Sequence, residues 1–149
     1  MTSWVRFWIE QARSWASRSK VPTTKVGCVL VGDSKEIVSV GFNGPPRGFP
    51  DSTIGELSRD HLRAISTHAE ANAVANAARL GVSTVGTTAY VTHPPCAQCA
   101  ALLVNAGVKR IYWVGELHPD WKQSIELAQW MLGKCGMEWM HIGDPKDES

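Results

Sequence analysis

The chain has 149 residues, of which 44% are hydrophobic and 19% charged, and its formal net charge is +1. This length and composition predict one globular domain with its own hydrophobic core. The near-neutral charge argues against a protein whose main partner is nucleic acid, because binders of that polyanion usually carry a basic face. Charged residues interrupt the first 20 positions and no apolar run is long enough to cross a bilayer, so we expect a cytoplasmic protein without a membrane partner.

The expected secondary structure alternates helices and strands along the chain. Apolar side chains at a three-and-four spacing predict an amphipathic helix over residues 2–18. Two apolar runs joined by a turn rich in glycine, aspartate and serine predict a hairpin of strands 26–31 and 36–42. A helical turn or two is expected around 54–65. Further helices are expected near 68–80, 96–105 and 120–132, and further strands at 87–92, 108–114 and 137–142.

This order of elements predicts an α/β fold in which helices cover both faces of one mixed, five-stranded sheet, giving three layers, α/β/α. Residues 1–143 would form the single domain, and residues 144–149 a polar tail. The run 43–50 is too rich in glycine and proline for a helix or a central strand, so it is expected to form a shaped loop.

The most informative motif is His68-Ala69-Glu70, which is followed by Pro95-Cys96 and by Cys99. The histidine and the two cysteines are good zinc ligands, and three protein ligands leave one position for water, as in catalytic zinc sites. Glu70 is not needed as a ligand and is close enough to move protons for whatever the metal binds. The spacing His-x-Glu, then Pro-Cys-x-x-Cys, is typical of zinc-dependent nucleobase deaminases.

Each part of this motif also has another interpretation. Thr67 and Glu70 fit a capping box at the start of helix 68–80, in which case His68 would be incidental. Cys96 and Cys99 alone could be a redox pair or half of a structural zinc site. The chain has no second Cys-x-x-Cys to complete a four-cysteine site, and a redox pair does not explain His-x-Glu. Together the two motifs therefore favour catalytic zinc.

The remaining cysteines and histidines are interpreted as structural or peripheral. Cys28 lies in an apolar run and is expected in the core, and Cys135 lies in a turn between two glycines. His93 precedes two prolines and is expected at the mouth of the pocket or at an interface, not on the metal. His118 and His141 are expected at the periphery.

Five segments together resemble the deoxycytidylate (dCMP) deaminases of the cytidine deaminase superfamily: 26–31, 41–48, 68–73, 90–96 and 106–111. The resemblance extends over about residues 4–114. The superfamily shares the zinc motif, whereas the loop Gly-Phe-Asn-Gly-Pro-Pro-Arg-Gly at 41–48 indicates the branch that acts on nucleotide monophosphates. This family usually has tyrosine where Phe42 stands.

The resemblance implies hydrolytic deamination of dCMP to dUMP and ammonia, which supplies dUMP for dTTP synthesis. It implies one catalytic Zn²⁺ per chain on the three ligands, with Glu70 as the proton carrier. It also implies that Asn43 contacts the deoxyribose, that the Ala69 N–H meets the base carbonyl, and that the Pro94 carbonyl accepts a hydrogen bond from the exocyclic amine.

The phosphate of such a substrate requires cationic or N–H donors. The basic residues near the motifs are the candidates, namely Lys20, Lys25, Arg47 and Arg63. The predicted substrate site takes Lys20 and Arg47 from this group, beside Asn43, Ala69 and Pro94.

The resemblance further implies a homohexamer that is regulated by dCTP and dTTP, the activator often with Mg²⁺, because these properties are common in the family. The loop 43–48 is similar to the effector-binding region of such proteins. Two other hypotheses remain. One is a deaminase of tRNA adenosine, of another nucleic acid or of free nucleosides, and the modest charge and the 43–48 loop argue against it. The other is a zinc-stabilised interaction module, and the spare carboxylate of Glu70 argues against that.

Overall fold

The computed structural model describes residues 2–116 and 118–143. Its helices are α1 (Ser3–Ala16), α2 (Arg59–Ile65), α3 (Ala69–Leu80), α4 (Ala97–Asn105) and α5 (Lys122–Lys134), with short 3-10 helices η1 (Asp51–Glu56) and η2 (Pro119–Trp121). Its strands are β1 (Gly27–Val31), β2 (Ile37–Phe42), β3 (Thr88–Val91), β4 (Arg110–Trp113) and β5 (Glu138–His141). The predicted tail at 144–149 lies outside the described residues.

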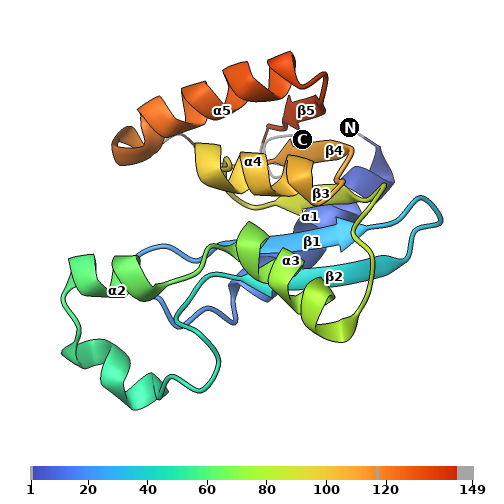
Figure 1. Cartoon of the computed structure of the whole chain (residues 1–149). Coiled ribbons are helices and arrows are strands. Elements are labelled where there is room, and N and C mark those ends of the chain that lie inside the picture. Colours follow the sequence, from blue (N-terminus) through green and yellow to red (C-terminus); the bar gives the residue numbers. More distant parts are fainter. Residues whose placement is uncertain (1, 117, 144–149) are drawn as a thin grey trace.

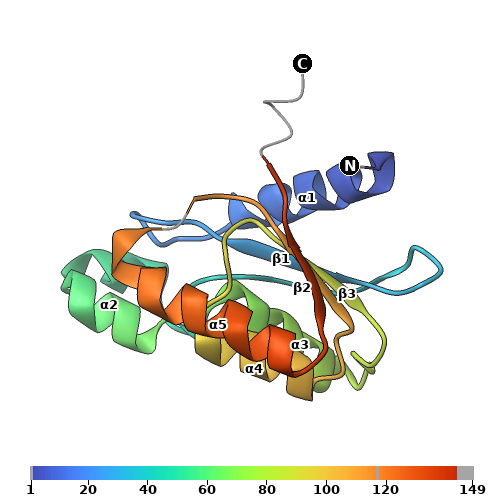
Figure 2. The same cartoon turned by 90° about the horizontal axis from the view of Figure 1, so that it is seen from above.

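The five strands form one mixed sheet in the order β2-β1-β3-β4-β5. β1 pairs antiparallel with both β2 and β3, whereas β3, β4 and β5 run parallel. α1 packs on one face of this sheet, and α3, α4 and α5 cover the other (Figures 1 and 2). The predicted three-layer α/β/α arrangement with a five-stranded mixed sheet is therefore confirmed.

β1 is buried on both sides, which explains why its sequence is a continuous apolar run. Cys28 and Leu30 belong to the core under α3, α4 and α5, and Val29 and Val31 belong to the core under α1. Cys28 is fully buried, as expected from the sequence. None of the helices in the described part of the chain has both the length and the apolar character needed to span a bilayer.

α3 lies very close to the edge strand β2, and this contact fixes the position of the predicted zinc helix. A Cβ atom on Gly41 would lie 2.3 Å from the Ala69 carbonyl oxygen and 2.4 Å from the Ala73 nitrogen. Polar side chains of α3 hold the same strand, because Asn72 Nδ2 donates to the Phe42 carbonyl (2.7 Å) and Asn76 Nδ2 to the Val40 carbonyl (2.8 Å). These two asparagines satisfy carbonyl groups of β2, which is an edge strand of the described sheet.

Gly41→Ala is expected to lower the free energy of unfolding by about 1–3 kcal/mol, because the new methyl group would meet backbone atoms of α3 that cannot rotate away. Denaturant-induced unfolding measures the change.

Gly133→Ala is the matched control for this variant, since no atom lies within 4 Å of a Cβ built at Gly133 in α5. This control should be neutral or gain up to about 1 kcal/mol from the better helix propensity of alanine. Equal stability of the two variants would contradict the close contact between α3 and β2.

Candidate active site

The three predicted zinc ligands lie at the beginnings of two neighbouring helices. His68 is the N-cap residue of α3, Cys96 is the N-cap residue of α4, and Cys99 lies in the first turn of α4. His68 Nδ1 is 3.6 Å from Cys96 Sγ and 3.3 Å from Cys99 Sγ. All three ligand atoms lie within 4.8 Å of one another. The structure thus brings together residues that are 28 and 31 positions apart in the chain.

This arrangement fits zinc in both distance and charge. Tetrahedral zinc with a nitrogen ligand at about 2.05 Å and a sulfur ligand at about 2.3 Å places those two ligand atoms about 3.6 Å apart. Hydrogen bonds to Cys96 Sγ, first from the Cys99 thiol and then from the His68 ring, lower the pKa of Cys96 to about 4, and the first of these bonds raises the pKa of the donating Cys99 thiol. Without a metal ion, therefore, the site favours one thiolate, at Cys96. The unpaired N–H groups at a helix N-terminus also favour a thiolate there.

Glu70 is the second residue of α3 and is buried, with only 4% of its surface exposed. Burial disfavours the charged carboxylate and raises the pKa of Glu70 to about 7. Within residues 2–116 and 118–143, the cluster of potential metal ligands contains the histidine and the two cysteines but not Glu70. The carboxyl group therefore lies beside the ligand cluster without belonging to it.

The capping-box interpretation of Thr67 and Glu70 is wrong. The N-cap residue of α3 is His68, and its side chain makes no capping hydrogen bond. Glu70 is the second helical residue and not the third. The backbone of Thr67 instead forms a β-bridge with Gly44, with N–H···O distances of 2.8 and 3.1 Å. The bridge ties the start of the zinc helix to the 43–48 loop.

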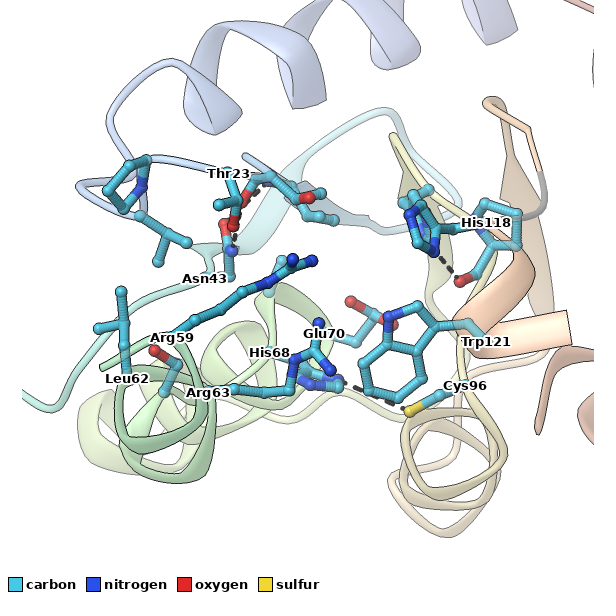
Figure 3. A pocket seen from close by; sticks show the side chains of 18 of the residues that line it. Thr23, Asn43, Arg59, Leu62, Arg63, His68, Glu70, Cys96, His118 and Trp121 are labelled. Atoms are coloured by element: carbon cyan, nitrogen blue, oxygen red, sulfur yellow. Dashed lines mark hydrogen bonds between the residues drawn. The ribbon is translucent and has the colours of Figure 1, made fainter. Parts of the chain in front are cut away.

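A cavity of about 640 Å³ opens next to these residues, which is within the usual range for a small-molecule site (Figure 3). Its inner wall contains His68, Ala69, Glu70 and Cys96. The other walls come from the loop after α1, the segment after β2, α2, the segment between β3 and α4, and the region around η2. They include Thr23, Asn43, Arg59, Arg63, His93, Pro94, His118 and Trp121.

Asn43 lines the cavity and also organises the loop opposite it. Its Oδ1 accepts a hydrogen bond from the Val26 N–H (2.8 Å), and its Nδ2 donates to the Thr24 carbonyl (2.8 Å). An amide can form two hydrogen bonds at each end, so both ends retain capacity for a ligand. The Pro94 carbonyl accepts a hydrogen bond from His93 Nδ1 at 3.1 Å. His93 is at the cavity, as predicted from the sequence.

Lys20 and Arg47 do not reach this cavity. Both line a second hollow of about 690 Å³, which shares Asn43 and Ile54 with the first cavity but contains no member of the ligand cluster. Arg47 is turned toward α3, where its Nη2 donates to Asn76 Oδ1 (2.8 Å). The sequence could not show which hollow these cations would line, and the structure does not place them with Glu70.

Two side chains from the region around η2, those of His118 and Trp121, line the cavity although no pattern in the sequence predicted them there. His118, expected at the periphery, is the N-cap residue of η2 and lines the cavity. The Trp121 ring lies edge-on to His68, with ring centroids 5.6 Å apart.

On α2, the sequence analysis did not single out Arg59, and Arg63 was one of several candidates for the phosphate. Their spacing of four residues, which puts both on one helix face, could have identified them.

Comparison with known proteins agrees with this geometry. The sequence profile of the "Cytidine and deoxycytidylate deaminase zinc-binding region" matches residues 2–115. The chain belongs to this family. It is therefore a zinc-binding deaminase domain, and the resemblance noted in its sequence is confirmed.

Individual relatives support the same assignment. An uncharacterised deaminase in the luxG 3′ region of Aliivibrio fischeri is 33% identical over 142 residues, which is 93% of this chain and 92% of that protein. Human deoxycytidylate deaminase is 32% identical over 122 residues, covering 78% of this chain and 67% of the relative. The crystal structure of dCMP deaminase from the cyanophage S-TIM5 in complex with dCMP and dUMP superposes with a TM-score of 0.77 at 26% identity, covering 95% and 99% of the two chains.

Purified protein is expected to contain about one zinc ion per chain, and Cys99→Ala is expected to lose it, because two ligands alone hold zinc weakly. Elemental analysis after dialysis against a mild chelator measures the zinc content.

The matched control is Cys135→Ala, which removes an exposed thiol outside the cluster and should leave the zinc content unchanged. A metal-free preparation with full deaminase activity would rule out the assigned metal site.

Proposed function

We propose that this deaminase hydrolyses dCMP to dUMP and ammonia. The observation that carries the proposal is the position of Glu70, a buried carboxyl group beside a His/Cys/Cys cluster that does not include it, at the base of a cavity large enough for a nucleotide. The choice of dCMP is supported by relatives named deoxycytidylate deaminase and by the similarity to the cyanophage enzyme crystallised with dCMP and dUMP.

In this mechanism His68, Cys96 and Cys99 would hold Zn²⁺. Zinc in such a site supplies a water molecule with a pKa near neutrality, which is the nucleophile for replacing an amine. Glu70 would take one proton from the attacking water and pass it to the ring nitrogen of the base. It would then take the second proton from the hydroxyl group added to the ring carbon and pass it to the amine, so that the carbonyl forms, the C–N bond breaks and ammonia leaves. A carboxyl group with a pKa of about 7 can both accept and release protons near neutral pH.

The surrounding backbone would orient the cytosine ring. Ala69 is the first residue of α3, so its N–H has no acceptor within the helix and can donate to the base carbonyl. The Pro94 carbonyl, which has a second lone pair beside its hydrogen bond from His93, would accept from the exocyclic amine. Asn43 would contact the deoxyribose with the free capacity of its amide.

Glu70→Gln is expected to lower kcat by about 10²–10⁴-fold, since the amide keeps the shape of the side chain but cannot accept the proton. Zinc content should be unchanged, because Glu70 lies outside the ligand cluster. An ammonia-release assay and metal analysis on the same preparation measure both quantities.

Glu56→Gln serves as the control, because this glutamate is exposed and lines neither cavity. Full activity of the Glu70 variant would refute its role as the proton carrier.

The substrate is tested by comparing dCMP, dCTP, cytidine and adenosine-containing RNA in the same ammonia-release assay. We expect the highest kcat/KM for dCMP. A preference for RNA would favour the alternative of a tRNA adenosine deaminase, which shares the zinc motif. Including 5-substituted dCMP shows how far the cavity tolerates a modified base.

We also propose, from the family resemblance, a homohexamer whose activity responds to dCTP and dTTP, with Mg²⁺ accompanying a nucleotide effector. The second hollow supports an effector site, because the 43–48 loop lines it together with Lys20, Arg47 and Arg79. Repeating the dCMP assay with either triphosphate and Mg²⁺ tests this part. A single domain over residues 1–143 and a cytoplasmic location complete the proposal.

A further inference from the structure

We propose that Arg59 and Arg63 of α2 bind the 5′-phosphate of the substrate and make the enzyme select a nucleotide over a nucleoside. This inference rests on the proposed function and assigns the phosphate to residues on a different element from Lys20 and Arg47. Both arginine side chains extend from α2 into the cavity that contains Glu70 (Figure 3).

The packing of Leu62 and the capping by Ser58 fix the orientation of α2, so that both arginines lie on its cavity side. Leu62 is buried and packs with Val21 and Ile54 in a small apolar cluster. The Ser58 hydroxyl accepts a hydrogen bond from the His61 N–H (3.0 Å) and caps the beginning of the helix. Residues four apart are neighbours on a helix surface, so the two guanidinium groups approach the cavity together.

The guanidinium groups of Arg59 and Arg63 have N–H donors available for a ligand. In the described part of the chain, neither of them forms an ion pair or donates a hydrogen bond to a protein acceptor. Arg63 instead lies over the Trp121 ring, 5.6 Å from its centroid, and this contact leaves the edge of the guanidinium free. Ser66 lines the same side of the cavity, and its buried hydroxyl has no hydrogen-bond partner among the described residues.

The chemistry of this wall matches a phosphate monoester. Such a group carries a charge of about −1.5 to −2 at neutral pH and has three strong acceptor oxygens. Two arginines balance that charge, and their planar N–H forks match the phosphate oxygens. The other carboxyl group of the cavity, Glu116, lies on the segment after β4 and not on α2. The phosphate is therefore expected at α2, and the base at Glu70.

The test compares dCMP with deoxycytidine, which differs only by lacking the phosphate. Arg59→Gln and Arg63→Gln are each expected to lower the ratio of kcat/KM for dCMP to that for deoxycytidine by about tenfold to a hundredfold, because each removes charge-assisted hydrogen bonds. The matched control is Arg18→Gln, an exposed arginine that lines neither cavity, and its ratio should equal that of the unmodified protein. Zinc content and thermal unfolding are measured for every variant.

A binding measurement separates this inference from the proposed reaction. Calorimetry on zinc-loaded protein compares dUMP with deoxyuridine, and the unmodified protein is expected to bind dUMP more tightly, with the difference reduced in both variants. If the unmodified protein prefers dCMP and both variants keep that preference in full, the arginine assignment is overturned while the reaction stands. If the protein deaminates neither compound but binds dUMP through these arginines, the reaction is wrong and the phosphate site stands. Equal binding of dUMP and deoxyuridine by the unmodified protein overturns the phosphate site.

Discussion

The meeting of two helix N-termini, those of α3 and α4, is the constraint on which the rest of the site depends. His68 begins one helix and Cys96 and Cys99 begin the other, so the ligand cluster exists only while both helices keep their places on the sheet. The strand order makes this possible, because β1 lies next to β3 and the helices that pack behind them are neighbours. Small side chains bring α3 close: Ala69, Ala73 and Ala77 are almost completely buried, and Gly41 of β2 leaves room for the helix backbone.

The close packing of α3 against the sheet also determines the pKa of the Glu70 carboxyl group. A carboxyl group in the first turn of a helix is normally stabilised as an anion by the helix dipole. Here burial outweighs that effect and raises the pKa of Glu70, although a backbone hydrogen bond and the nearby His68 ring lower it. The result is a carboxyl group that exchanges protons near neutrality. Its tuning is therefore a consequence of how tightly α3 packs, and it could not be assigned from the spacing His-x-Glu alone.

The sequence predicted well those features that are encoded locally. The three ligands and Glu70 follow a fixed spacing, and the apolar run of β1 is visible because both of its faces are buried. Thr67 and Glu70 also satisfied a local pattern, the capping box, but Thr67 pairs with Gly44 in a β-bridge, His68 is the N-cap residue, and the helix begins at Ala69. When two local patterns share one residue, contacts with distant parts of the chain decide between them.

The substrate-facing residues were harder to predict, since their positions depend on how loops fold over the sheet. Lys20 and Arg47 are close to the motifs in sequence but face the second hollow, whereas Arg59 and Arg63 reach the cavity because Leu62 anchors a short helix beside it. The net charge of +1 also hid this pair, because two local cations change the total very little. In the proposed function, the reaction and the substrate are thus specified by different parts of the fold. The helix starts would hold the metal and the proton carrier, and the segments between Asn43 and His68 would select the molecule that is presented to them.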